Sequence, residues 1–191
     1  MKNLCFILML VSFCAAGQRM GLKAGVNLGK QKIISQGVTI NSESSVLYMG
    51  GFFISDKISD ELSLGGELVY SVDGGKYNFT GLGFGGVITQ RYHYLSIPVL
   101  LKYHASEYFN INAGLQAGYL FKAEEESLGT TGDFTSDARK INVSVVFGAE
   151  ANLRAFDLGF RYILGLSNIN DTPDPLEVKL STIQIYLGQT F

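Results

Sequence analysis

Apolar and polar side chains alternate with a period of two residues along most of this chain. The clearest example is NVSVVFGAEANLRAFDLGFRY, from Asn142 to Tyr162, in which one set of alternate positions is apolar and the other holds Glu150, Asp157 and Arg161. Successive side chains point to opposite faces of a β-strand, whereas an amphipathic helix repeats its apolar positions every three or four residues. The pattern therefore predicts strands with one apolar and one polar face.

Eight stretches of this kind follow one another, at residues 20–29, 45–55, 61–72, 92–103, 107–121, 140–153, 156–167 and 178–191. The connections after the second, fourth and sixth are short, and the four long ones are Lys30 to Ser44, Asp73 to Arg91, Lys122 to Arg139 and Asn168 to Glu177. Barrels of the outer-membrane type have tight turns on the periplasmic side and longer loops outside. The sequence predicts an all-β fold, an eight-stranded antiparallel up-and-down transmembrane β-barrel. A soluble sandwich or lipocalin-like barrel is the alternative.

The orientation of the two faces follows from the charges. If the sixth and seventh strands form a hairpin that turns at Arg154-Ala155, Glu150 and Arg161 become diagonal neighbours on one face and the other face is wholly apolar. An Arg or Lys facing lipid in mid-membrane costs about 2–4 kcal/mol, so the polar face must line the barrel interior. The predicted interior residues are Lys23, Glu67, Lys102, Asn110, Glu150, Asp157 and Arg161, and the predicted outward residues include Leu22, Val26, Leu68, Ile97, Val99 and Ile111.

The first residues, MKNLCFILMLVSFCAAGQ, have the layout of a secretory signal peptide, with a basic start, an apolar run and small residues at the end. Cleavage before Gln18 divides the chain into a signal peptide, residues 1–17, and one barrel domain, residues 18–191. The apolar run is shorter than a membrane-spanning helix, and bulky Phe13 argues against lipidation at Cys14. The net charge of −2 provides no basic surface for nucleic acid.

Several segments in series resemble the outer-membrane β-barrel family of Bacteroidota that includes PorT-like proteins. They are GLKAGVNLG, LSLGGELVYSVDGGK, YLSIPVLLKYH, NINAGLQAGYLF, GFRYILGLSNI and the closing IQIYLGQTF. The resemblance implies an outer-membrane barrel, and one class of the family is linked to protein secretion across that membrane. It brings no catalytic motif. The terminal Phe191 resembles the signal that directs such barrels to the barrel-assembly machinery for insertion.

Candidate chemistry elsewhere in the sequence is sparse. His93 and His104 fall at opposite ends of one strand, too far apart to share a metal ion, and no cysteine remains after the signal peptide. Pairing of a histidine with Ser96 or Ser106 would suggest a hydrolase at the barrel rim. The acidic residues of one outer loop, Glu124, Glu125, Glu126, Asp133 and Asp137, either hold divalent cations shared with lipopolysaccharide or are simply solvated.

We therefore expect an integral protein of the bacterial outer membrane with a lumen filled by side chains. Its predicted function is non-enzymatic, with adhesion, envelope integrity or secretion support carried by the extracellular loops. The expected partners are outer-membrane lipid and lipopolysaccharide, the barrel-assembly machinery and a protein at the loops; no cofactor is expected. The alternatives are a rim enzyme that acts on outer-membrane lipid and a soluble exported ligand-binding barrel.

Overall fold

The computed structural model describes residues 19–191 except 36–37, 82–83, 128, 154–155 and 173–175, and of residues 79–81 and 84–85 it describes the backbone alone. The predicted signal peptide and the Arg154-Ala155 turn lie outside the described residues. No helix in the described part of the chain is long and apolar enough to cross a membrane.

The described chain forms ten β-strands and one short 3₁₀ helix, η1. Their bounds are β1 (Arg19–Ser35), β2 (Val38–Asn41), β3 (Ser45–Lys57), β4 (Leu62–Gly81), β5 (Phe84–Ser106), β6 (Phe109–Ser127), β7 (Thr130–Asp133), η1 (Thr135–Asp137), β8 (Ile141–Leu153), β9 (Phe156–Gly165) and β10 (Leu176–Thr190).

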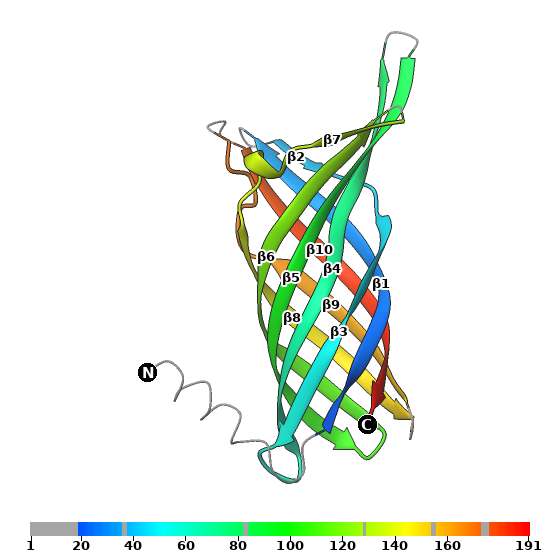
Figure 1. Ribbon diagram of the computed structural model, residues 1–191, viewed down its shortest axis with the longest axis vertical. Coiled ribbons are helices and arrows are strands. Elements are labelled where there is room, and N and C mark those ends of the chain that lie inside the picture. Colours follow the sequence, from blue (N-terminus) through cyan, green and yellow to red (C-terminus); the bar gives the residue numbers. More distant parts are fainter. Residues whose placement is uncertain (1–18, 36–37, 82–83, 128, 154–155, 173–175) are drawn as a thin grey trace.

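Eight of these strands close into a barrel (Figure 1). The strands β1, β3, β4, β5, β6, β8, β9 and β10 pair antiparallel in chain order, and β10 pairs back onto β1 from Gly21–Thr190 to Ser35–Leu176. The predicted eight-stranded up-and-down barrel is confirmed. The first and last strands of the ring have their free ends at the same end of the barrel, which we call the short-turn end; the opposite end is the extended end.

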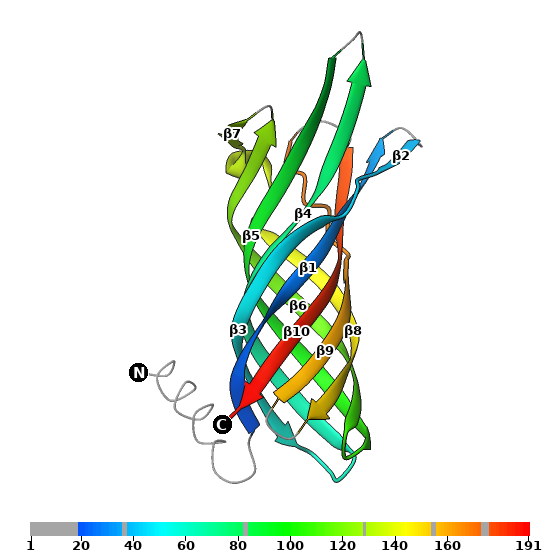
Figure 2. The same ribbon diagram turned by 90° about the vertical axis from the view of Figure 1, so that its right-hand side faces the viewer.

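The long connections are the part of the fold that the sequence pattern misjudged. The predicted loop Asp73 to Arg91 is a hairpin, because β4 and β5 continue as paired strands to Gly81 and Phe84 and rise beyond the rest of the barrel (Figure 2). Likewise β2 folds back on the end of β1 within 30–44, and β7 folds back on the end of β6 within 122–139. Alternation marks a strand only where its two faces meet different surroundings, and in these segments it is interrupted, as by Lys30, Gln31 and Lys32 near the end of β1.

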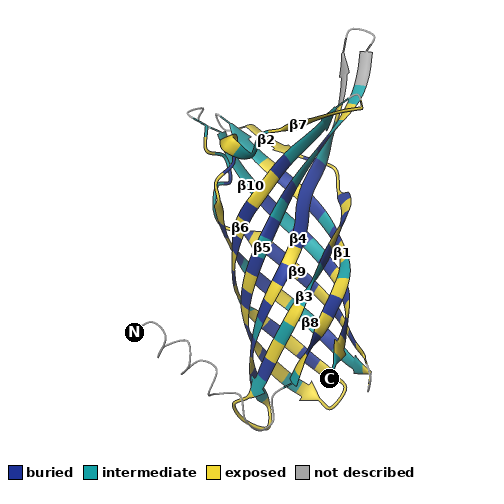
Figure 3. Ribbon diagram, viewed as in Figure 1, coloured by how far each residue is buried: buried dark blue, intermediate teal, exposed yellow. Residues whose placement is uncertain are grey.

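Within the ring, buried and exposed residues alternate along each strand (Figure 3). Phe147 and Phe160 are about half exposed on the outside, at 53% and 51%, whereas Glu150 and Arg161 inside are 4% and 1% exposed. The β8–β9 hairpin has the predicted register, including the pair Gly148–Arg161. The predicted outward residues are all exposed: Leu22, Val26, Leu68, Ile97, Val99 and Ile111.

The interior changes from polar to apolar toward the extended end. A buried cluster there packs side chains of β5, β6 and β10 against the segment around η1 and the connection that precedes β10. Its members are Tyr92, Tyr94, Leu120, Ala123, Ala138, Ile169 and Leu180, with Phe134 and Val178 packed against them. The expectation of a polar lumen is therefore wrong at this end, where an apolar cap closes the barrel.

Candidate functional site: the polar interior

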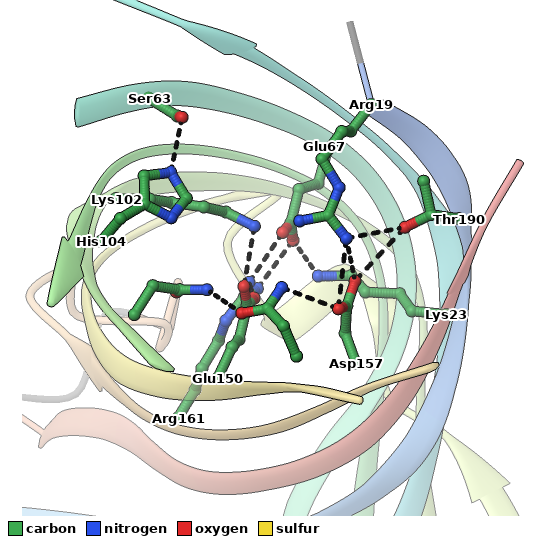
Figure 4. Close-up of polar contacts among 12 residues, drawn as sticks. Arg19, Lys23, Ser63, Glu67, Lys102, His104, Glu150, Asp157, Arg161 and Thr190 are labelled. Carbon is green, nitrogen blue, oxygen red and sulfur yellow. Dashed lines mark hydrogen bonds and ion pairs between the residues drawn. The ribbon is translucent and has the colours of Figure 1, made fainter. Parts of the chain in front are cut away.

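Arg161 of β9 lies in the middle of the interior and binds two carboxylates (Figure 4). Its Nη1 and Nη2 donate to Oε2 and Oε1 of Glu67 on β4 at 2.7 and 2.8 Å, and Nη2 also donates to Oε1 of Glu150 on β8 at 2.9 Å. Lys23 of β1 pairs with Glu67, and Lys102 of β5 donates to Glu150 at 2.9 Å. The planar fork of a guanidinium fits this two-point binding of a carboxylate. The five residues, which we call the central cluster, join five strands of the ring.

The central cluster contains three basic and two acidic side chains, all buried. Taking charges out of water is costly, and an ion pair offsets the cost only when its members satisfy one another. Removing one partner of a buried pair typically costs about 3–5 kcal/mol, because the other charge is left uncompensated. Any other relative placement of these strands would leave buried charges without partners.

Tyr186 of β10 completes the central cluster, and sequence reasoning missed it. Its hydroxyl donates to Oε1 of Glu150, and its ring lies 4.7 Å from Nζ of Lys23 and 4.6 Å from Cζ of Arg161. A cation near the face of an aromatic ring is attracted by the electron density of that ring. The available signal was the position of Tyr186 in IQIYLGQTF, where it belongs to the inward set of alternate residues.

Asp157 does not join the central cluster, although the alternation predicts that it faces the interior as the cluster does. It accepts hydrogen bonds from Nη2 of Arg19 at 3.3 Å and from Nδ2 of Asn152 at 2.9 Å, near the short-turn end (Figure 4). Thr190 binds the same carboxylate at 3.4 Å. Of the seven predicted interior residues, five form the central cluster, whereas Asp157 lies four positions from Arg161 along β9 and pairs with Arg19. The seventh, Asn110, is buried and donates a 2.9 Å hydrogen bond to Asn152.

Asp73 is a buried carboxylate that the sequence placed at the start of an outer loop. The structure corrects this: Asp73 is 8% exposed and accepts hydrogen bonds from the hydroxyls of Ser71 at 2.5 Å and Thr182 at 2.7 Å. Among the described residues it has no ion-pair partner. Asn27 and Gln184 lie in the same region and are joined by a 3.0 Å hydrogen bond, so neutral polar groups fill the interior between the central cluster and the apolar cap.

A cavity of about 490 Å³ opens at the short-turn end and is bounded on its inner side by Lys102 and Asp157. His104 lies in its wall and makes a 2.7 Å hydrogen bond with Ser63, not with Ser106 as considered from the sequence. Two cavities deeper in the barrel measure about 10 Å³ each, which is room for about one water molecule. A cavity of about 200 Å³ lies at the extended end beside Tyr92, Phe134 and Ile169 of the apolar cap. The interior is therefore filled by side chains between a wide short-turn mouth and a smaller hollow at the cap.

His93 lies on the outer surface and not beside Ser96, which faces the interior. Its Nδ1 makes a 2.7 Å hydrogen bond with the hydroxyl of Tyr70, and its Nε2 lies 3.2 Å from Glu124. Nζ of Lys122 lies 2.5 Å from Oε1 of the same glutamate. This ion pair, beyond the apolar part of the wall, lowers the pKa of Glu124 and raises the pKa of Lys122. The pairing of His93 with Ser96 is therefore wrong.

The acidic run on β6 is largely paired within the protein. Glu125 accepts a hydrogen bond from Gln90 at 2.8 Å, and Glu126 pairs with Arg91 at 2.8 Å. No group of three or more His, Cys, Asp or Glu residues with the geometry of a metal site occurs among the residues that the structure describes.

Known structures resemble this fold at low sequence identity. Ail, the attachment invasion locus protein of Yersinia pestis, matches with a TM-score of 0.55 and 16% identity, over 92% of this chain and 99% of that one. Ail in complex with the heparin analogue sucrose octasulfate gives 0.52 and 17%, with the same coverage. Neisserial surface protein A gives 0.51 and 11%, over 92% of this chain and 98% of that one. These matches show a shared barrel fold.

No curated protein matches the sequence. The model of the family described as outer membrane protein beta-barrel domain matches residues 16–171, which includes all strands of the ring except β10. The apolar outer wall, the polar interior and this match agree, and they contradict the soluble alternative. The chain therefore belongs to the outer-membrane β-barrel domain family and resides in the bacterial outer membrane.

Proposed function

We propose that this protein is a closed, non-enzymatic barrel that supports binding elements on the outside of the cell. The observation that carries the proposal is the filling of the interior by the central cluster, in which Arg161 binds Glu67 and Glu150 from two other strands. An eight-stranded barrel is just wide enough for its own side chains. The central cluster, like the pair between Arg19 and Asp157, has a structural role in this proposal and is not a path for solute.

The binding elements are the hairpins at the extended end. Outer-membrane barrels place their short turns in the periplasm and their long connections outside, so the extended end faces the surroundings of the cell. The upper β4–β5 hairpin, β2 with the end of β1, and β7 with the end of β6 offer exposed strand surface to a partner there. Because these elements continue ring strands, the barrel holds them in fixed directions.

Adhesion is the function best supported among adhesion, envelope integrity and secretion support. The support comes from the similar fold of Ail, whose name describes attachment and invasion. We also propose that residues 1–17 are a cleaved signal peptide, that the chain is of the PorT-like type found in Bacteroidota, and that Phe191 directs insertion by the barrel-assembly machinery. Phe191 is 72% exposed, which leaves its side chain free for recognition. Lipid and lipopolysaccharide are the proposed partners of the barrel wall.

The rim-enzyme alternative has one observation in its favour, the hydrogen bond between Ser63 and His104. A hydrolytic triad also requires an acid that orients the histidine. No carboxylate bonds to His104 among the described residues. We therefore propose a structural role for this pair.

The proposal is tested by complementing a deletion strain with two variants. In the first, residues 75–90 are replaced by a two-residue turn, which removes the upper hairpin; in the second, Ser63→Ala and His104→Ala remove the candidate enzyme site. We expect the first variant to fold, as shown by heat-modifiable migration on gels, and to fail in cell attachment. The second should behave as wild type. Normal attachment without the hairpin, or a changed lipid profile in the second variant, would contradict the proposal.

Closure is measured separately in planar bilayers. A barrel filled as described should carry no steady ion current at physiological salt. A stable open conductance from the wild-type protein would contradict the closed interior, whatever the outcome of the attachment assay.

A further inference from the structure

A groove lies on the outer wall where β9, β10 and β1 run side by side at the extended end, with a volume of about 610 Å³. Tyr162 and Leu164 of β9 and Leu166, just after β9, form an apolar part of its lining, and Lys30, Lys32 and Lys179 form a basic part on β1 and β10. Neutral residues, among them Asn41 and Ser181, complete the lining.

The basic part begins where the apolar wall ends. Along β1 the outward-facing residues are apolar up to Leu28, and the next two are Lys30 and Lys32. On the adjacent β10, Ile183 pairs with Leu28 and is followed by Ser181 and Lys179. Since paired residues are direct neighbours in the sheet, the change from apolar to basic occurs at about the same level on both strands. A change of this kind is expected where the surface that contacts hydrocarbon ends.

The arrangement of the lysines at this boundary favours the binding of an anion. Lys32 and Lys179 are directly opposite in the β1–β10 register, and like charges in that arrangement repel. Lys179 pairs with Glu177 at 2.7 Å. Lys30 and Lys32 have no ion-pair partner among the described residues, so the groove has an excess of positive charge.

Other basic residues at the extended end are of two kinds. Arg91, Lys122 and Arg139 are each paired with a carboxylate, at 2.8, 2.5 and 3.4 Å. Lys76 and Lys140, like Lys30 and Lys32, have no ion-pair partner among the described residues, but neither of them lines the groove. What distinguishes the groove is that it gathers three lysines beside an apolar surface.

We propose that this groove binds the phosphorylated headgroup of an outer-leaflet lipid. The phosphate lies among Lys30, Lys32 and Lys179, and an acyl chain runs down the wall beside Tyr162 and Leu164. The continuity of the basic part with the apolar wall favours a lipid over a soluble anion, because a free phosphate makes no use of the apolar part. This inference rests on the proposed contact of the barrel wall with outer-membrane lipid and names the site and the chemistry of that contact.

The test compares lipid retention by wild type and by the triple variant Lys30→Gln, Lys32→Gln and Lys179→Gln. Each barrel is reconstituted with bisphosphorylated lipid A or with dephosphorylated lipid A, extracted in mild detergent and examined by native mass spectrometry. Wild type should retain the phosphorylated lipid about tenfold more than the dephosphorylated one, and the triple variant should lose that preference. The matched control is Lys140→Gln, which removes a basic residue at the same end of the barrel but outside the groove.

A second variant addresses folding. Lys30→Arg with Lys32→Arg keeps both charges and should keep the preference, whereas equal retention of the two lipids by folded wild type overturns the proposal without reference to any variant. Stabilisation of wild type against heat by inorganic phosphate alone, lost in the triple variant, would show a free-anion site and also overturn it. Cell attachment by the triple variant should be unchanged, so failure of the lipid site and failure of the attachment function are distinguishable.

Discussion

Arg161 and Glu67 form a two-point ion pair across the barrel interior although they lie 94 positions apart in the sequence. Glu67 also pairs with Lys23, so one carboxylate serves two basic groups, and Glu150 likewise serves Lys102 and Arg161. With three basic side chains for two acidic ones, the acidic residues are the scarcer members. The effect of removing a charge should therefore depend on its sign.

Glu67→Gln is expected to destabilise the barrel more than Lys23→Met. The first change leaves three buried cations with one carboxylate, and removing one partner of a buried pair typically costs about 3–5 kcal/mol. The second leaves two basic and two acidic side chains and should cost less than half as much. Urea unfolding in phosphatidylcholine vesicles measures both free energies of unfolding. Equal losses of the free energy of unfolding in the two variants would show that the balance of charge does not determine the stability of the cluster.

Gly159→Ala should displace Tyr186 from Glu150. A Cβ at residue 159 would lie 2.1 Å from Cζ of Tyr186, so the ring must move or the strands must separate. Overpacking of this kind costs about 1–3 kcal/mol. Gly50→Ala is the matched control, since its nearest contact would be the carbonyl oxygen of Lys23 at 3.7 Å. Urea unfolding should show a loss for the first variant alone; two unaffected proteins would contradict the described packing.

Phe160→Lys and Phe156→Lys test the position of the membrane along one strand. Both phenylalanines face outward, but Phe156 begins β9 and Phe160 lies near its middle. A lysine at the bilayer midplane costs about 2–4 kcal/mol, and one near the interface costs about 0–1 kcal/mol. Folding titrations in vesicles should rank the variants in that order. The reverse order would place the hydrocarbon layer elsewhere on the barrel.

Ile169→Ala should loosen the apolar cap without opening the ring. Ile169 is 1% exposed and packs in the cap, yet it belongs to the connection before β10 and to no ring strand. Truncating a buried isoleucine to alanine typically costs about 2–5 kcal/mol, and here the loss falls on contacts of the connecting segments. Hydrogen exchange should become faster in residues 134–138 and 168–170, with the ring strands still protected. Leu166→Ala, at an exposed position nearby, should leave exchange unchanged.

The sequence predicts the strands of the ring and their order, but it does not predict which inward side chains contact one another. The β8–β9 register was predictable because two adjacent strands and a short turn leave one arrangement that puts Phe147 and Phe160 on the same face. The stagger of all eight strands determines which inward residues lie at the same height across the ring. The alternation along single strands gives no information about this stagger. The contact of Arg161 with Glu67 follows from the stagger, whereas the separation of Asp157 follows from its distance of four positions from Arg161 along β9.

Asp73 illustrates a second limit. In the sequence it precedes two glycines and looks like the start of a loop, since nothing in VDGGK marks which polar residue is inside. Its burial depends on β10, whose Thr182 donates to it from 109 positions away. The local pattern of alternate residues therefore identifies inward positions only where the two faces of a strand meet different surroundings.

The seam between β1 and β10 has a consequence for biogenesis. Every ring strand except these two pairs with the ring strands that precede and follow it along the chain, whereas β1 needs β10, which begins only at Leu176. Until β10 pairs with it, one edge of β1 has no partner strand, and unpaired strand edges promote aggregation. The ring closes only when β10 pairs with β1. Deletion of the last dozen residues of this sequence should therefore yield an open sheet and not a smaller barrel.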